Sequence, residues 1–156
     1  MEKRAYIDEC GINKALVRER ARAARGIKIE DVKSGKKFDR TNVVAAKLDK
    51  KIIEPFCYSE NMTGALFVEW FRKKFVKSVP KGTTAILDNA SFHPPKKLKN
   101  LCKRHGIKLL FLPAYSPDYN DIEKTWANMK RALVDTIPIC ENVSSAIYQY
   151  FDVSNF

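Results

Sequence analysis

The stretch LPAYSPDYNDIEKTW, residues 112–126, marks a change from loop to helix. Pro113 and Pro117 predict a loop, because proline lacks a backbone donor and restricts the residue before it. From about residue 121, apolar side chains recur at helical spacing: Ile122, Trp126, Met129 and Leu133. We therefore predict a helix over 121–134 that packs this stripe into the core and carries Glu123 in its first turn.

Apolar runs and turn signals divide the rest of the chain into further elements. Strand-forming residues fill 5–11, 41–47, 51–58, 83–88 and 107–112. Helical patterns mark 63–79, 96–105 and 143–151. The charged segment 13–40 shows no sustained period, and we predict a long loop there. Strands come first and then alternate with helices, which is typical of an α/β fold with a mixed sheet covered by helices.

The chain is strongly basic for its size. Its 156 residues carry 29 Lys and Arg against 18 Asp and Glu, a formal net charge of +11. Such a charge favours a polyanionic partner, first nucleic acid and second an anionic membrane surface. Charges interrupt every apolar run before the ~18 residues that a membrane-spanning helix needs, and the first residues have no apolar signal core. We therefore expect a cytoplasmic protein without a membrane partner.

Three carboxylates stand at unusual places in these elements. Asp8 and Asp88 each end an apolar strand, and Glu123 lies in the first turn of the predicted helix. Such positions converge at one end of the sheet in α/β proteins, where carboxylates repel one another unless a cation lies between them. Magnesium suits such a cluster, because it takes oxygen ligands and leaves room for substrate phosphates. Pairs of such ions promote displacement at phosphodiesters, so the predicted substrate is DNA or RNA.

Each of the three also has a purely structural interpretation. Asp8 is able to cap a turn whose bend Gly11 supplies, and Asp88 is placed to form an Asx-turn. Asn120 and Glu123 have the spacing of a capping box, which stabilises a helix by about 1 kcal/mol without any catalysis. Spacing alone therefore leaves both interpretations open.

The sequence around these carboxylates resembles a known family. YIDE at 6–9, LDNASFH at 87–93 and the block at 112–126 are similar to the catalytic blocks of DDE transposases of the Tc/mariner superfamily, in its bacterial insertion-sequence branch. The 34 residues between Asp88 and Glu123 match the family's spacing of its second and third acidic residues. The resemblance covers about 6–133. It implies an RNase H-like fold, shared with retroviral integrases, in which helices flank a mixed five-stranded sheet.

The resemblance also implies an activity. Asp8, Asp88 and Glu123 would be the catalytic residues and would hold two Mg²⁺ or Mn²⁺ ions in the active complex. The implied reaction is cleavage at transposon ends, followed by attack of the freed 3′-hydroxyl on target DNA. The expected partner is double-stranded DNA, bound by a dimer. The chain departs from the family at Ala114 and Asp121, where prolines are common.

The domain organisation also differs from the family pattern. The family usually has an N-terminal helix-turn-helix region that reads the transposon ends, and we expect 1–156 to lack it. We therefore expect 1–156 to form a single catalytic domain, with a separate helix-turn-helix polypeptide as a candidate partner. Because the branch is bacterial, the expected location is the prokaryotic cytoplasm, in association with the nucleoid.

Further residues are predicted to support the carboxylates or to bind DNA. Asn89 suits a hydrogen bond to a ligand carboxylate, and His93 suits a phosphate contact or the orientation of a metal-bound water; both also suit simple turns. Glu9 would point away from Asp8 on a strand, so we interpret it as facing solvent or as a backup to the three carboxylates. Unbalanced basic residues after Asp88 predict contact with the DNA backbone: Lys96, Lys97, Lys99, Lys103 and Arg104.

Two other functions are consistent with parts of the sequence. An RNase H-like nuclease or junction resolvase would keep the fold and the metals, but the block at 112–126 argues against it. A catalytically inactive DNA-binding remnant is disfavoured by the three intact carboxylates. Asp121 and the missing end-reading region favour it. DNA cleavage and strand transfer is the leading prediction.

Overall fold

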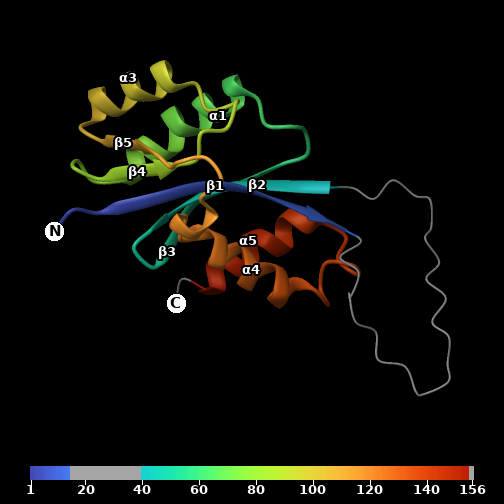
Figure 1. Ribbon diagram of the computed structural model, residues 1–156. Helices are drawn as coiled ribbons and strands as arrows, with labels where there is room; N and C mark the ends of the chain where they lie inside the picture. The colour runs from blue at the N-terminus through green and yellow to red at the C-terminus, as the bar shows by residue number, and fades with distance from the viewer. Residues whose placement is uncertain (15–39, 155–156) are drawn as a thin grey trace, which may run out of the picture.

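The computed structural model describes residues 1–14 and 40–154, and a five-stranded sheet lies at its centre (Figure 1). The strands are β1 (Arg4–Asn13), β2 (Arg40–Leu48), β3 (Lys51–Tyr58), β4 (Thr84–Leu87) and β5 (Lys108–Phe111). Their order across the sheet is β3-β2-β1-β4-β5. β1 pairs antiparallel with β2 and parallel with β4, so the sheet is mixed, as predicted. The loop predicted over 13–40 falls mainly outside the described residues.

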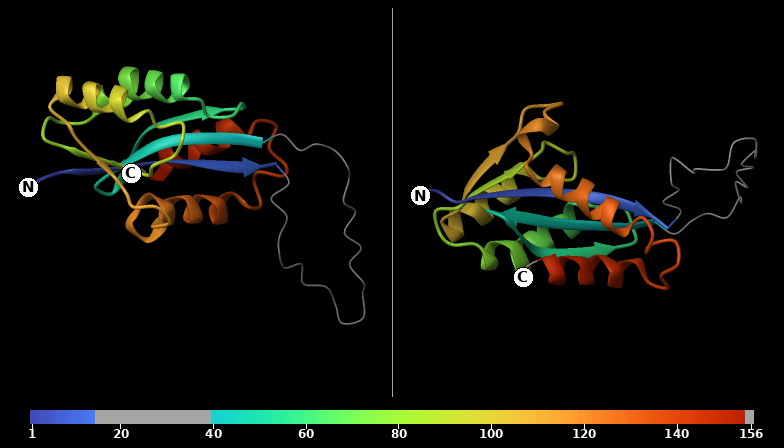
Figure 2. Two further views of the ribbon diagram at one scale, coloured as in Figure 1. Left: turned by 45° about the horizontal axis from the view of Figure 1, so that its top comes forward. Right: turned by 90° about the horizontal axis from the view of Figure 1, so that it is seen from below.

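Helices cover both faces of the sheet, as the two views of Figure 2 show. α1 (Gly64–Trp70) and α3 (Pro95–His105) lie on one face, and α4 (Ile122–Leu133) and α5 (Val143–Ser154) lie on the other (Figure 1). A short 3₁₀ turn, η2 (Pro117–Tyr119), precedes α4. Within the described part of the chain, no helix combines the length and apolarity that crossing a bilayer requires.

The helix predicted over 63–79 is continuous but changes its winding. α1 passes into a π-helical turn, η1 (Phe71–Phe75), and then into the short α2 (Val76–Ser78). Side chains four residues apart drift around an α-helix, which has 3.6 residues per turn. The wider π turn offsets this drift. As a result Phe67, Phe71 and Phe75 all stay fully buried.

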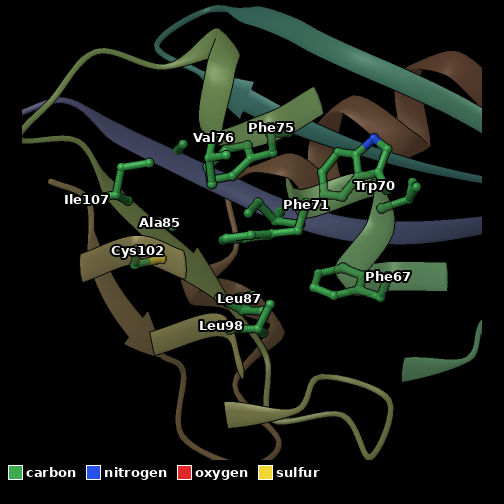
Figure 3. Close-up of a cluster of buried hydrophobic side chains, with 14 residues drawn as sticks. Phe67, Trp70, Phe71, Phe75, Val76, Ala85, Leu87, Leu98, Cys102 and Ile107 are labelled. Carbon is green, nitrogen blue, oxygen red and sulfur yellow. The ribbon is translucent and has the colours of Figure 1, made fainter. Parts of the chain in front are cut away.

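A hydrophobic core lies against each face of the sheet. Figure 3 shows the first, in which Phe67 and Phe71 lie near Leu87 of β4 and Leu98 of α3. The second core joins α4 and α5 to the strands: Cys10, Ile12, Val43, Ala45, Ile122, Trp126, Met129 and Ile147. β1 contributes to both cores, because successive residues of a strand point to opposite faces. The central strand is therefore covered on both sides.

Candidate active site

The three predicted carboxylates lie at one end of the sheet. Asp8 is in β1, Asp88 directly follows β4, and Glu123 lies in the first turn of α4. β1 and β4 are parallel neighbours, and the register that pairs Tyr6 with Ile86 brings Asp8 level with Asp88. Asp88 and Glu123 line one surface hollow, together with the loop between β5 and α4. Three distant parts of the sequence thus supply acidic groups to one region.

Asp8 is the most enclosed of the three carboxylates. Burial raises the pKa of Asp8 to about 7, and the charges of Glu9, Glu123 and Asp88 add to the increase. All these acidic groups therefore lie within electrostatic reach of Asp8. The indole N–H of Trp126 donates to Asp8 Oδ2 at 3.1 Å. This bond connects β1 directly to the helix that carries Glu123.

His93 joins Asp88 to Glu9 beneath the surface. Its side chain has no exposed area, and its ring centroid lies 4.3 Å from that of Phe67. Nδ1 is 3.0 Å from the main-chain oxygen of Asp88 and 3.1 Å from Asp88 Oδ1. Nε2 is 3.0 Å from Glu9 Oε1. Both ring nitrogens face oxygen atoms, an arrangement that favours the protonated, positively charged ring.

The charges in this bridge shift two pKa values in opposite directions. Burial alone would lower the pKa of His93, but its hydrogen bonds to Asp88 and Glu9 raise the pKa to about 9. The bond from His93 holds the pKa of the Asp88 carboxyl below its usual value. Asp88 Oδ1 also accepts from the main-chain N–H of Ala90 at 3.2 Å. Within the described residues no hydrogen bond reaches Asp88 Oδ2, which stays available to a ligand.

The prediction that Glu9 faces solvent is wrong. Its side chain is only 13% exposed and its Oε1 binds His93. Strand alternation does place Glu9 opposite to Asp8, as expected. The error lies in assuming that the opposite face is open, because helices cover both faces of this sheet. Glu9 points toward α1 and Asp8 toward α4.

The alternative interpretation of Asn120 and Glu123 as a capping box is not supported by the structure. Asp121 occupies the N-cap position of α4, and no side chain caps the helix. The N–H of Glu123 bonds to the main-chain oxygen of Asn120 at 3.1 Å. Asn120 follows the 3₁₀ turn η2 and is buried at the hollow. In the described part of the structure its Oδ1 is a buried polar atom without a partner.

The remaining predicted residues are exposed. Asn89 lines the hollow, but within the described residues no hydrogen bond joins it to any of the three carboxylates. The basic residues Lys96, Lys97, Lys99, Lys103 and Arg104 lie on α3, whose Leu98 and Cys102 face the core. Among the described residues, these five form no ion pair. Their positive charges are therefore accessible to a polyanion.

The donor set fits a hard divalent cation, although the side chains are not arranged around one. Among the described residues, no group of three or more His, Cys, Asp or Glu side chains is placed to hold a metal ion. The binding of a metal ion by Asp8, Asp88 and Glu123 therefore stays a prediction. Their oxygen chemistry and their mutual repulsion nevertheless suit Mg²⁺ or Mn²⁺. A cation between them would relieve the repulsion that contributes to the raised pKa of Asp8.

The family follows from a comparison of the sequence with family models. The model for DDE superfamily endonucleases matches residues 3–142. The chain belongs to this family. The match to the DDE superfamily endonucleases spans all three carboxylates as well as Glu9 and His93. No curated protein sequence matches this DDE family member.

Solved structures share the fold of this DDE family member. A Mos1 transposase paired-end complex with the left transposon end aligns with a TM-score of 0.73 at 16% identity, over 96% of this chain and 47% of that chain. The catalytic domain of Mos1 mariner transposase gives 0.63 at 15% identity, over 96% and 69%. The catalytic core of BIV integrase gives 0.53 at 18% identity, over 69% and 70%. The predicted RNase H-like fold is confirmed, and the chain spans about half the length of the first transposase.

Two supporting residues were missed by sequence reasoning. Trp126 was assigned only to the hydrophobic stripe, yet its indole N–H binds Asp8. Glu9 was assigned to solvent, yet it binds His93. Trp126 is the only polar-tipped side chain in its stripe, and a buried tryptophan N–H usually finds a partner. This preference was the signal in the sequence from which a polar partner of Trp126 could have been predicted.

Proposed function

We propose that the chain is the catalytic domain of a DNA transposase, which cleaves DNA at transposon ends and joins the freed 3′-hydroxyl to target DNA. The grouping of Asp8, Asp88 and Glu123 at one end of the sheet, in a DDE family member, carries this proposal. The net charge of +11 and the open basic face of α3 support a DNA substrate. The Mos1 complexes with the same fold include a pre-cleavage transpososome.

Asp8, Asp88 and Glu123 would hold two Mg²⁺ or Mn²⁺ ions in the active complex. The Mos1 paired-end complex has been solved with Mn and with Mg. When bound, such ions activate the attacking oxygen and stabilise the leaving oxygen of a phosphodiester. Trp126 and His93 hold the first two carboxylates in place through their hydrogen bonds. The basic residues of α3 would position the DNA backbone.

The biological setting is proposed from the sequence resemblance. The chain would come from a bacterial insertion sequence and act on DNA in the cytoplasm, at the nucleoid. Residues 1–156 would form one catalytic domain. Joining two transposon ends calls for a dimer on DNA, and a separate helix-turn-helix polypeptide would recognise the end sequence.

The decisive experiment compares the wild-type protein with Asp88→Asn in cleavage and strand transfer. The substrate is DNA carrying the element's ends, with Mg²⁺ or Mn²⁺ present. We expect the variant to lose metal-dependent activity while its DNA binding persists or tightens, because a negative charge near phosphate is removed. Equal activity of both proteins would contradict the mechanism.

The same assay separates transposition from simple hydrolysis. A transposase joins labelled donor ends to target DNA, whereas a nuclease or junction resolvase only produces nicks. Nicked DNA without joined products would contradict the transposase proposal and indicate a nuclease instead. Binding without either product, in the presence of manganese, would identify an inactive DNA-binding remnant.

A further inference from the structure

Lys47 occupies an unusual place on β2. Val43 and Ala45 are fully buried on the face of β2 that meets α4, and Lys47 is the next residue on that face. The register places Ala45 opposite Asp8 and Lys47 opposite Tyr6. Lys47 thus follows two buried apolar residues on this face of β2, on the strand that pairs with the strand of Asp8. Its side chain is only 16% exposed.

The ammonium group of Lys47 donates two hydrogen bonds to Asp121. Lys47 Nζ is 2.6 Å from Asp121 Oδ2 and 3.3 Å from the main-chain oxygen of Asp121. Asp121 directly precedes α4, and its carboxylate makes no capping bond to that helix. A cation is unfavourable beside a helix N-terminus, so helix stability does not account for the lysine. The two bonds instead fix the start of α4 relative to β2.

Polar contacts flank Glu123 on both sides along α4. Lys47 binds Asp121, two residues before Glu123, and Trp126 binds Asp8, three residues after it. The apolar packing of α4 supplies attraction but little direction, because the hydrophobic effect is non-directional. A metal-binding side chain must be held to within about 0.5 Å of its working position. The directional contacts at 121 and 126 are suited to that task.

We propose that Lys47 is a positioning residue for Glu123 and acts through Asp121. The inference rests on the proposed function, because it concerns how the third carboxylate is held near the other two. It also gives Asp121 a role at a position where the family commonly has proline. Proline pre-organises a helix start by fixing its backbone angle. In this chain the ion pair between Asp121 and Lys47 would instead hold the start of α4 against β2.

The test removes the charge of Lys47 and keeps its bulk. Lys47→Met preserves the buried stem, and Lys47→Arg preserves the charge. Lys3→Met is the matched control, because Lys3 forms an exposed ion pair at 3.8 Å with Asp49, in the turn that follows β2, and that pair does not involve α4. Urea unfolding first establishes that each variant is folded.

The first readout needs neither metal nor DNA. The chain has two tryptophans, so a nitrogen–proton NMR spectrum contains two indole signals. Trp126 donates to Asp8, and Trp70 donates to the main-chain oxygen of Glu54 at 3.0 Å. We expect Lys47→Met to shift the Trp126 signal and to leave the Trp70 signal unchanged. Lys3→Met should shift neither.

The second and third readouts are manganese titration and single-turnover DNA cleavage. For Lys47→Met we expect the manganese concentration at half-saturation to rise about tenfold, and the cleavage rate to fall at least about tenfold, since a displacement of 1 Å is enough for such losses. DNA affinity should stay within about twofold, because phosphate contacts are made elsewhere. Lys47→Arg should recover most of the rate.

Three results would overturn the inference. A wild-type Trp126 signal and wild-type manganese affinity in Lys47→Met would refute a positioning role. A rate for Lys47→Arg as low as for Lys47→Met also refutes it. Shifts of both indole signals with lower stability would identify a general structural role instead. If the wild-type protein cleaves no DNA, the proposed function fails, while the indole and manganese measurements still decide the role of Lys47.

Discussion

Replacing His93 with Asn should destabilise the metal-free protein, and the loss should depend on pH. His93 is buried and its two ring nitrogens face Asp88 and Glu9. Its pKa is raised from 6.5 to about 9 in the folded protein. The difference corresponds to about 3.5 kcal/mol of extra stability when the ring is charged, at roughly 1.4 kcal/mol per pKa unit.

The direction of the pH dependence follows from the raised pKa. A group that binds its proton more tightly in the folded state stabilises that state fully below its unfolded pKa. This stabilisation is therefore complete below about pH 6.5 and is lost as the pH rises through 9. The wild-type protein should exceed His93→Asn in stability most at pH 6 and least at pH 9.5.

The assay is urea unfolding of both proteins with a chelator present, from pH 6 to 9.5. Asp8, whose pKa is about 7, also titrates in this range. Comparing the two proteins at each pH largely removes its contribution. Glu9→Gln is the second variant, because it keeps an acceptor for His93 but removes a charge. It should reduce the pH-dependent part of the difference.

A difference between wild type and His93→Asn that stays constant, or grows with pH, would refute the reasoning. Nitrogen NMR of the imidazole offers an independent check. A neutral ring at pH 7.5 would show that the contacts with Asp88 and Glu9 do not hold a second proton.

Two further predictions concern helix α4 and helix α3. Trp126→Phe keeps an aromatic ring but removes the bond to Asp8. Urea unfolding at pH 8.5, where Asp8 is charged, should show a loss of about 2 kcal/mol, the usual size for a hydrogen bond to a charged group; an unchanged free energy of unfolding would show that this bond contributes nothing. Replacing Lys96 and Lys99 together with Gln should lower the slope of log binding constant against log salt by about 2, measured by DNA titration at several salt concentrations. An unchanged slope would place the phosphate contacts elsewhere.

Much of the fold was predictable because its elements follow local patterns. The stripe of Ile122, Trp126, Met129 and Leu133 repeats with helical period, and α4 is found where that pattern predicts it. The hairpin of β2 and β3 and the short β4 likewise follow from runs of strand-forming residues. Such signals depend only on neighbours in sequence. The π turn at Phe71–Phe75 was not predictable in this way, because it responds to the core that it faces.

The candidate site was predictable only in its residue types and rough location. Asp8, Asp88 and Glu123 were picked out by their places at the ends of elements. The partners of these groups depend on which elements cover the sheet. That is why Glu9 was expected in solvent and Asn120 at a cap, and why the bonds from Trp126 to Asp8 and from Lys47 to Asp121 were not foreseen.

Helix α4 supplies both Glu123 and much of the apolar cover for one face of the sheet. A chain cut short before this helix would therefore lose an acidic ligand and expose Val43, Ala45 and Ile12 in the same event. The cover of this core and the completion of the three-carboxylate set therefore depend on one and the same helix.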